Sequence, residues 1–149
     1  MKEMLKKENI QILEKVSNWQ EAIKVAVQPL IDTGYVEPRY VDGIIENTNK
    51  YGPYYVLCED LALLHAGSDQ GVIKKQLAIT ILREPIRFKA DGYNVRVLLT
   101  LAADDPESHM DAIRSISTIF SDPKQIKRLV DATSTDDIYE QFMAAAEQK

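Results

Sequence analysis

Two long apolar runs constrain the fold of this 149-residue chain more than any other feature. Residues 77–82 and 95–101 are almost continuously apolar, with no regular polar alternation. Runs of this kind are typical of strands that are buried on both faces, which requires helices on both sides of their sheet. The sequence therefore predicts an α/β fold in which a small mixed β-sheet is sandwiched between helices.

The remaining elements are predicted from periodicity and from residues that begin or end helices. Residues 22–31 carry apolar side chains on one helical face, and we expect Ser17 and Gln20 to cap this helix and Gly34 to end it. A second helix is expected to begin at Pro38 and to end before Gly52. Further strands are predicted at residues 10–13 (an edge strand), 54–58 and 61–64, and the chain from residue 105 onward reads as helices.

Length and composition indicate a single domain over residues 1–149. The formal net charge is −5 and the basic residues are scattered, which argues against nucleic-acid binding. Cys58 is the only cysteine, so no internal disulfide can form and a reducing cytoplasm is expected. No apolar run approaches the roughly 20 residues that span a bilayer, so no membrane insertion is expected.

The two histidines are the candidate reactive residues. His65 follows an apolar strand and opens a small polar loop, a common place for reactive side chains in α/β proteins. His109 falls in the first turn of a predicted helix that Asp105 caps, and the positive end of the helix dipole favours a neutral imidazole there. The residues alone leave another interpretation open, in which His65 bonds a loop carbonyl and His109 faces solvent.

The segments 47–57 and 61–67 resemble enzyme IIA of the bacterial sugar phosphotransferase system, in the mannitol/fructose superfamily. Members of that superfamily have a glycine or threonine before a proline, then an aromatic strand, then a small-apolar run that ends in the phosphorylated histidine. The stretches 19–22, 36–41 and 51–54 look most similar to the ascorbate-specific subgroup, and the resemblance extends over nearly the whole chain.

The resemblance implies a cytoplasmic phosphocarrier with the mannitol-type enzyme IIA fold. His65 would accept phosphate from the carrier protein HPr, and His109 would position it together with the loop amides of Ala66, Gly67 and Ser68. The phosphoryl group would pass to a cysteine of enzyme IIB and then, through membrane enzyme IIC, to a sugar such as L-ascorbate or a related sugar acid or pentitol. The resemblance implies no metal and no cofactor, and the sequence leaves a homodimer open.

The chain departs from the family pattern at two places. Leu64 stands where the family usually has proline, and residues 47–50 lack the arginine of mannitol-type members. We expect Leu64→Pro to be tolerated with little change in stability. Two alternatives stay open: a regulatory IIA paralogue that controls a partner protein, and a scaffold that cannot be phosphorylated. Cys58 is followed by Glu59 and Asp60, which would repel phosphate, so we do not interpret it as the cysteine of a IIB component.

Overall fold

A computed structural model describes residues 4–147 of the chain. The elements in chain order are β1 (Leu5–Leu13), α1 (Trp19–Asp32), α2 (Arg39–Tyr51), β2 (Val56–Cys58), β3 (Asp60–Leu64), the short 3-10 turn η2 (Ser68–Gln70), β4 (Gln76–Arg87), β5 (Asn94–Ala102), α3 (Pro106–Ile119), α4 (Pro123–Val130) and α5 (Thr135–Glu147). The side chains of the following residues in α3 and α5 lie outside the described part of the structure: Pro106, Ser108, His109, Asp111, Ser115, Ile119, Ala146 and Glu147.

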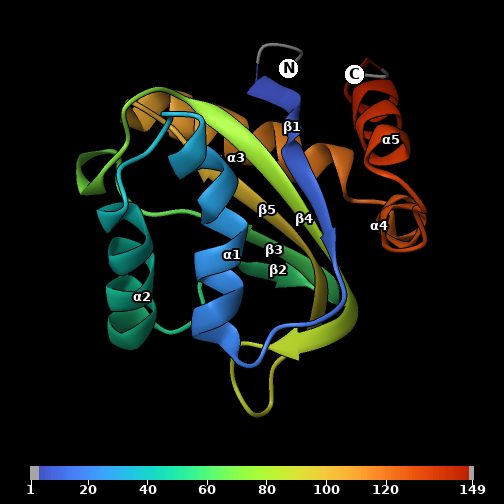
Figure 1. Cartoon of the computed structure of the whole chain (residues 1–149), viewed down its shortest axis with the longest axis horizontal. Coiled ribbons are helices and arrows are strands. Elements are labelled where there is room, and N and C mark those ends of the chain that lie inside the picture. The colour runs from blue at the N-terminus through green and yellow to red at the C-terminus, as the bar shows by residue number, and fades with distance from the viewer. Residues whose placement is uncertain (1–3, 148–149) are drawn as a thin grey trace.

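The five strands form one mixed sheet in the order β1-β4-β5-β3-β2 (Figure 1). β4 and β5 pair antiparallel at the centre, β1 runs parallel to β4, β3 runs parallel to β5, and β2 pairs antiparallel with β3 at the other edge. Because β3 and β5 are parallel neighbours, their carboxyl ends meet at one edge of the sheet. The loop after β3 and the start of α3 therefore lie at the same edge.

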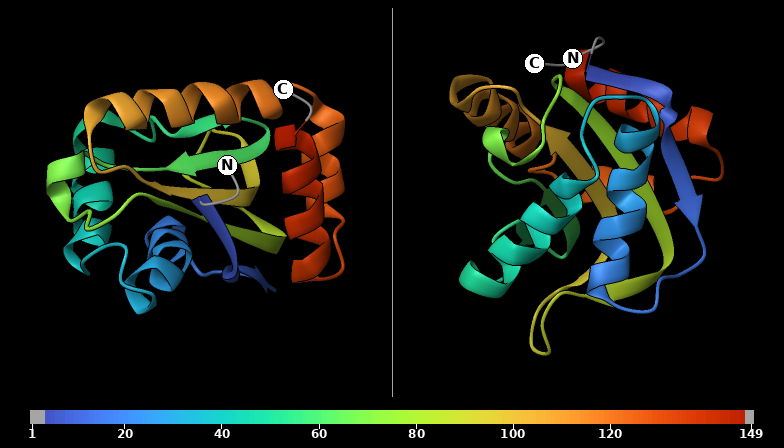
Figure 2. Two further views of the ribbon diagram at one scale, coloured as in Figure 1. Left: turned by 90° about the horizontal axis from the view of Figure 1, so that it is seen from above. Right: turned by 60° about the vertical axis from the view of Figure 1, so that its left-hand side comes forward.

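Helices cover both faces of the sheet, as the apolar runs predict. Figure 2 shows α1 and α2 on one face and α3 across the other, with α4 and α5 beside it. Alternate residues of β5 confirm this arrangement: Leu98 and Ala102 pack with the α1 and α2 side, whereas Val97 and Leu99 pack with the opposite core cluster. Among the described residues, no helix is both long and apolar enough to cross a bilayer.

Several element boundaries differ from the predicted ones: β4 continues to Arg87, and β2 begins only at Val56. The edge strand begins at Leu5 rather than at residue 10, and the intervening charged residues 6–8 are exposed. The cap of α1 is shifted by one residue: the Asn18 side chain accepts from the Glu21 amide at 2.8 Å, and the Glu21 carboxylate accepts from the Ser17 amide at 2.7 Å. The predicted Ser17–Gln20 pair is thus wrong, because Asn18 is the N-cap residue and Glu21 bonds the amide that precedes it.

Leu64 is a core residue. Its side chain is fully buried among the residues between the sheet and helices α1 and α2, and its backbone is in register with Thr100 of β5. The burial of Leu64 therefore replaces the neutral effect on stability expected of Leu64→Pro with an expected loss. A proline would remove much of a buried side chain and has no amide hydrogen for the sheet.

We now expect Leu64→Pro to lower the free energy of unfolding by about 2 to 5 kcal/mol, the range for truncating a buried leucine. Urea unfolding followed by circular dichroism measures the change. Leu64→Ala serves as the reference that loses the side chain but keeps the amide. An unfolding midpoint equal to that of the unmodified chain would contradict the role of Leu64 in the core.

Candidate functional site

His65 is the first residue after β3, and it lines a surface hollow of about 720 Å³. The hollow is built from the carboxyl end of β3, the turn η2, the second half of α2 and the first turns of α3. The residues that line it are Asn47, Tyr51, Tyr54, His65, Ala66, Gly67, Ser68, Asp69 and Met110. The fold thus places the predicted histidine at a concave surface that another molecule can reach.

The imidazole of His65 is oriented by the backbone of its own strand. Its Nδ1 lies 2.6 Å from the carbonyl oxygen of Leu63. A carbonyl oxygen only accepts hydrogen bonds, so Nδ1 is the protonated nitrogen of the neutral ring. The lone pair is consequently on Nε2, the nitrogen that can act as a nucleophile.

Tyr54 holds both the ring and the backbone of His65. Its hydroxyl donates to the His65 carbonyl oxygen, and its ring meets the imidazole edge to face with the centroids 5.1 Å apart. Burial raises the pKa of Tyr54, and a side-chain hydrogen bond with Asn47 acts in the opposite direction. Tyr54 therefore remains a protonated donor at neutral pH.

The three loop amides predicted to hold phosphate have different surroundings. The Ala66 amide donates to the buried hydroxyl of Tyr40 at 3.0 Å, and the Gly67 amide donates to Oε1 of Gln70 at 2.7 Å. Both donors are thus used within the protein, which corrects the expectation that they face a phosphoryl group. Ser68 begins η2 and lines the hollow.

The backbone of His109 lies in α3, next to Met110, which lines the hollow and is half exposed. The second histidine thus belongs to the segment of α3 that borders His65. Its side chain lies outside the described residues, so the pairing of the two imidazoles stays a prediction.

Other charged or reactive groups are less suited to chemistry at this site. Burial raises the pKa of the Cys58 thiol, and Asp60 and Glu59 raise it further, so the thiolate is disfavoured. The Arg39 guanidinium is held by Glu37 at 2.9 Å and donates to the Asp69 carbonyl at 3.2 Å. Among the side chains that the structure describes, no three histidine, cysteine or acidic groups cluster as metal ligands.

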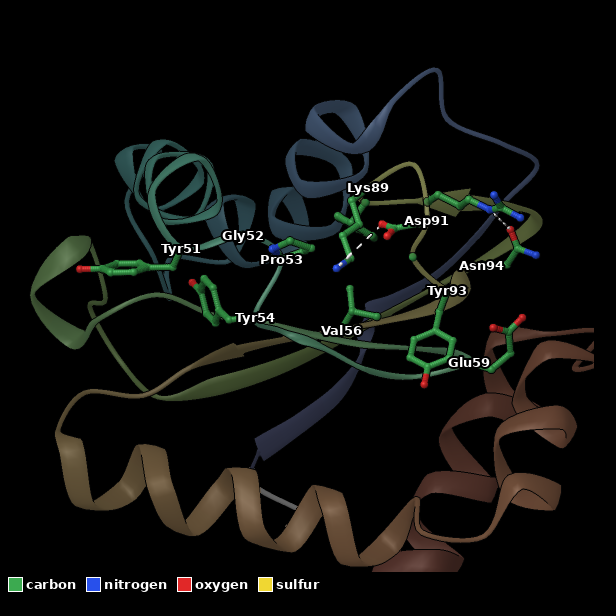
Figure 3. A pocket seen from close by; sticks show the side chains of 13 residues that line it. Tyr51, Gly52, Pro53, Tyr54, Val56, Glu59, Lys89, Asp91, Tyr93 and Asn94 are labelled. Atoms are coloured by element: carbon green, nitrogen blue, oxygen red, sulfur yellow. Dashed lines mark hydrogen bonds and ion pairs between the residues drawn. The ribbon is translucent and has the colours of Figure 1, made fainter.

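A second cleft, of about 760 Å³, adjoins the hollow (Figure 3). We call it the hairpin cleft because residues 87–94, around the turn from β4 to β5, form one of its walls. Tyr51 and Tyr54 line both the hollow and this cleft, and Figure 3 shows Tyr93 and Glu59 at its other end. Anything large enough to cover His65 from this side also meets the hairpin cleft.

The sequence pointed to His65 but missed the side chains that hold it. Tyr40, Asn47 and Tyr54 lie upstream of the histidine, and Gln70 lies beyond it. The sequence placed Tyr40 only within a predicted helix and Tyr54 only within a predicted strand. The one local signal was the Gly67-x-x-Gln70 spacing, in which the glutamine side chain returns to the first amide of a turn.

The described residues thus form an α/β protein that presents the imidazole of His65, at the carboxyl end of a strand, to an open hollow. A model of the family "Phosphoenolpyruvate-dependent sugar phosphotransferase system, EIIA 2" matches residues 3–144. The chain belongs to this family, and the resemblance found in the sequence is confirmed.

Relatives agree in sequence and in fold. The ascorbate-specific PTS system EIIA component of Escherichia coli K12 is 33% identical over 123 residues, which are 81% of this chain and 80% of that protein. The crystal structure of IIA mannitol from Escherichia coli superimposes with a TM-score of 0.81 at 31% identity, over 92% of this chain and 97% of the other. Enzyme IIA mannitol in complex with phosphorylated enzyme IIB, also from Escherichia coli, gives a TM-score of 0.83 at 29% identity, over 94% and 97% of the two chains.

Proposed function

We propose that this protein is a cytoplasmic phosphocarrier that accepts a phosphoryl group from phospho-HPr on Nε2 of His65 and passes it to the cysteine of an enzyme IIB. The observation that carries the proposal is the hydrogen bond from Nδ1 of His65 to the Leu63 carbonyl at 2.6 Å. It assigns the proton to one nitrogen and the lone pair to the other, in a ring that lines an open hollow.

This arrangement accounts for each bond, electron pair and proton in the transfer. The Nε2 lone pair attacks the phosphorus atom in line, a new P–N bond forms, and the P–N bond to the donor histidine breaks so that its electron pair stays on the donor imidazole. The proton on Nδ1 stays in place, and the Leu63 carbonyl oxygen stabilises the positive charge that the phosphorylated ring acquires. Transfer to a thiolate reverses the process at His65.

We assign the stabilisation of the phosphoryl group's negative charge to neutral hydrogen-bond donors and to the amino-terminal end of α3. Among the residues that the structure describes, no lysine or arginine lines the hollow. We assign phosphate contacts to the Ser68 amide, to the His109 side chain and to the first amides of α3, whose dipole favours an anion. A site without a fixed guanidinium suits a carrier that must release its phosphoryl group to the next protein.

His109→Ala is expected to slow phosphoryl acceptance without abolishing it, because His109 positions charge and is not the nucleophile. The loss of one such donor typically costs roughly 100- to 1000-fold in rate. Rapid-quench measurement of the labelling rate with phospho-HPr gives the value. If the variant is labelled at the rate of the unmodified protein, His109 does not belong to the site. If the variant takes up no phosphate, His109 is essential for the transfer.

A protein partner is supported by the exposed apolar side chains near His65. The large exposed apolar side chains of the described residues are Tyr51, Tyr54, Leu57, Ile73, Tyr93 and Met110. All of these except Leu57 and Ile73 line the hollow or the hairpin cleft. Exposed aromatic residues gathered at one place are typical of protein interfaces. We assign this face to enzyme IIB, in keeping with the complex known for the mannitol relative.

The sugar we propose is L-ascorbate or a related sugar acid or pentitol. Its support is the similarity to the ascorbate-specific component of Escherichia coli. Uptake of labelled ascorbate by cells that carry this protein together with the IIB and IIC proteins of an ascorbate system tests the assignment. Growth and uptake on another sugar alone would contradict the assignment to ascorbate. A regulator protein whose activity depends on the phosphorylation state of this chain would favour a regulatory paralogue.

The central experiment is incubation with phosphoenolpyruvate, enzyme I and HPr, followed by the intact mass of the protein. We expect the mass to rise by one phosphoryl group, only when all three components are present. Addition of the matching IIB should then return the protein to its starting mass. A mass that never changes would overturn the proposed function and support the scaffold that cannot be phosphorylated.

A further inference from the structure

A pair of side-chain amides joins the middle of α2 to the end of the loop that carries His65. Nδ2 of Asn47 donates to Oε1 of Gln70 at 3.1 Å, and Nε2 of Gln70 donates to Oδ1 of Asn47 at 3.4 Å. We call this pair the amide bridge. The close approach depends on Gly43, where an added Cβ atom would lie 3.1 Å from the Cβ and Nε2 atoms of Gln70.

The Gln70 half of the amide bridge also holds one end of the segment 65–67. Oε1 of Gln70 accepts the Gly67 amide at 2.7 Å, beyond His65. Asn47 and Tyr54 both line the hollow, and the Tyr54 hydroxyl donates to the His65 carbonyl. The bridge therefore ties α2 to the contact that fixes the backbone beyond Ala66, while Tyr54 fixes the backbone at His65.

We propose that Asn47 and Gln70 are positioning residues for phosphoryl transfer at His65, an inference that rests on the function proposed above. By fixing the backbone of residues 65–67, the amide bridge keeps Nδ1 on the Leu63 carbonyl and Nε2 presented to the incoming phosphorus. Contacts that fix this backbone are important here because Leu64 lacks the ring that restricts φ in proline. Neither amide has to touch the phosphoryl group.

The expected cost of losing the bridge is kinetic more than structural. Net gains from neutral hydrogen bonds in a partly solvated place are small, so the fold should survive their loss. In-line transfer is far more sensitive, since a misplacement of about 1 Å can reduce a rate by roughly 100-fold. A structural role and a positioning role therefore predict different measurements.

Gln70→Met tests the inference, because methionine is similar in length to glutamine but has no amide. Steady-state phosphoryl transfer from phospho-HPr through this protein to enzyme IIB should show kcat reduced by roughly 10- to 100-fold, with the KM for phospho-HPr nearly unchanged. The matched control is Gln28→Met on α1, which also removes an amide donor, here one that bonds the exposed Asp32 at 2.8 Å. The two variants should have similar melting temperatures, and only Gln70→Met should be slow.

The ring tautomer of His65 supplies a second readout that does not require transfer. Nitrogen-15 NMR of the two imidazoles should show His65 as the Nδ1–H tautomer in the unmodified chain and as a mixture in Gln70→Met. Gln70→Glu should restore the single tautomer, because its carboxylate still accepts the Gly67 amide and Nδ2 of Asn47. If Gln70→Met does not fold, Asn47→Ala applies the same test, since it opens the bridge and retains the bond from Gly67 to Gln70.

Unchanged kcat and an unchanged tautomer in a folded variant would overturn the inference. Failure of the proposed function looks different: the unmodified protein itself would then take up no phosphate from phospho-HPr. The NMR comparison still decides in that case whether the amide bridge orients His65.

Discussion

His65→Ala is expected to abolish phosphoryl uptake completely. The substitution removes the only nitrogen lone pair that the geometry assigns to the attack, and it leaves the strand and loop backbone in place. Incubation with labelled phosphoenolpyruvate, enzyme I and HPr, followed by electrophoresis, measures the uptake. The circular dichroism spectrum of the variant should match that of the unmodified chain, because the partly buried ring lines the hollow and belongs to neither core cluster.

The chemistry of the label provides a further check on this result. A phosphoryl group on an imidazole nitrogen should be lost in acid and retained in base, unlike a serine phosphate. His109→Ala is the matched variant, since it removes the other imidazole and should still be labelled slowly. Labelling of His65→Ala to the level of the unmodified protein would show that the acceptor lies elsewhere.

Tyr40→Phe is expected to cause a large loss of stability for the removal of one atom. The buried Tyr40 hydroxyl donates to the Leu101 carbonyl at 2.7 Å and accepts the Ala66 amide at 3.0 Å. Burial raises the pKa of this hydroxyl, so it is protonated throughout the neutral range. Its removal leaves a buried donor and a buried acceptor without partners, at about 1 to 3 kcal/mol each.

We therefore expect Tyr40→Phe to lower the free energy of unfolding by about 2 to 6 kcal/mol, measured by urea denaturation. Tyr55→Phe is the matched control. Tyr55 is equally buried, but its hydroxyl bonds Thr48 at 2.8 Å, and the Thr48 hydroxyl keeps its own bond to the Ile44 carbonyl at 2.7 Å. Its loss should cost about 1 kcal/mol. Equal losses for the two variants would contradict the link from Tyr40 to the His65 loop.

The strands and helices were predictable wherever burial leaves a local pattern. The central strands β4 and β5 are apolar because both of their faces are covered, and α1 shows its buried face at helical spacing. The pattern fails where burial is partial. The first half of β1 was missed because an edge strand bonds a neighbour on one side only, so its charged side chains can remain in water.

The sequence by itself determined the fold class, the family and the place of His65 at the end of a strand, since each depends on residues that are close in the chain. Only the tertiary structure decided what holds that histidine. The contacts from Tyr54 to His65, Asn47 to Gln70 and Tyr40 to Ala66 span 11, 23 and 26 positions. No periodicity records contacts at such separations. They arise because the parallel strands β3 and β5 end at one edge of the sheet, where α2 packs against the His65 loop.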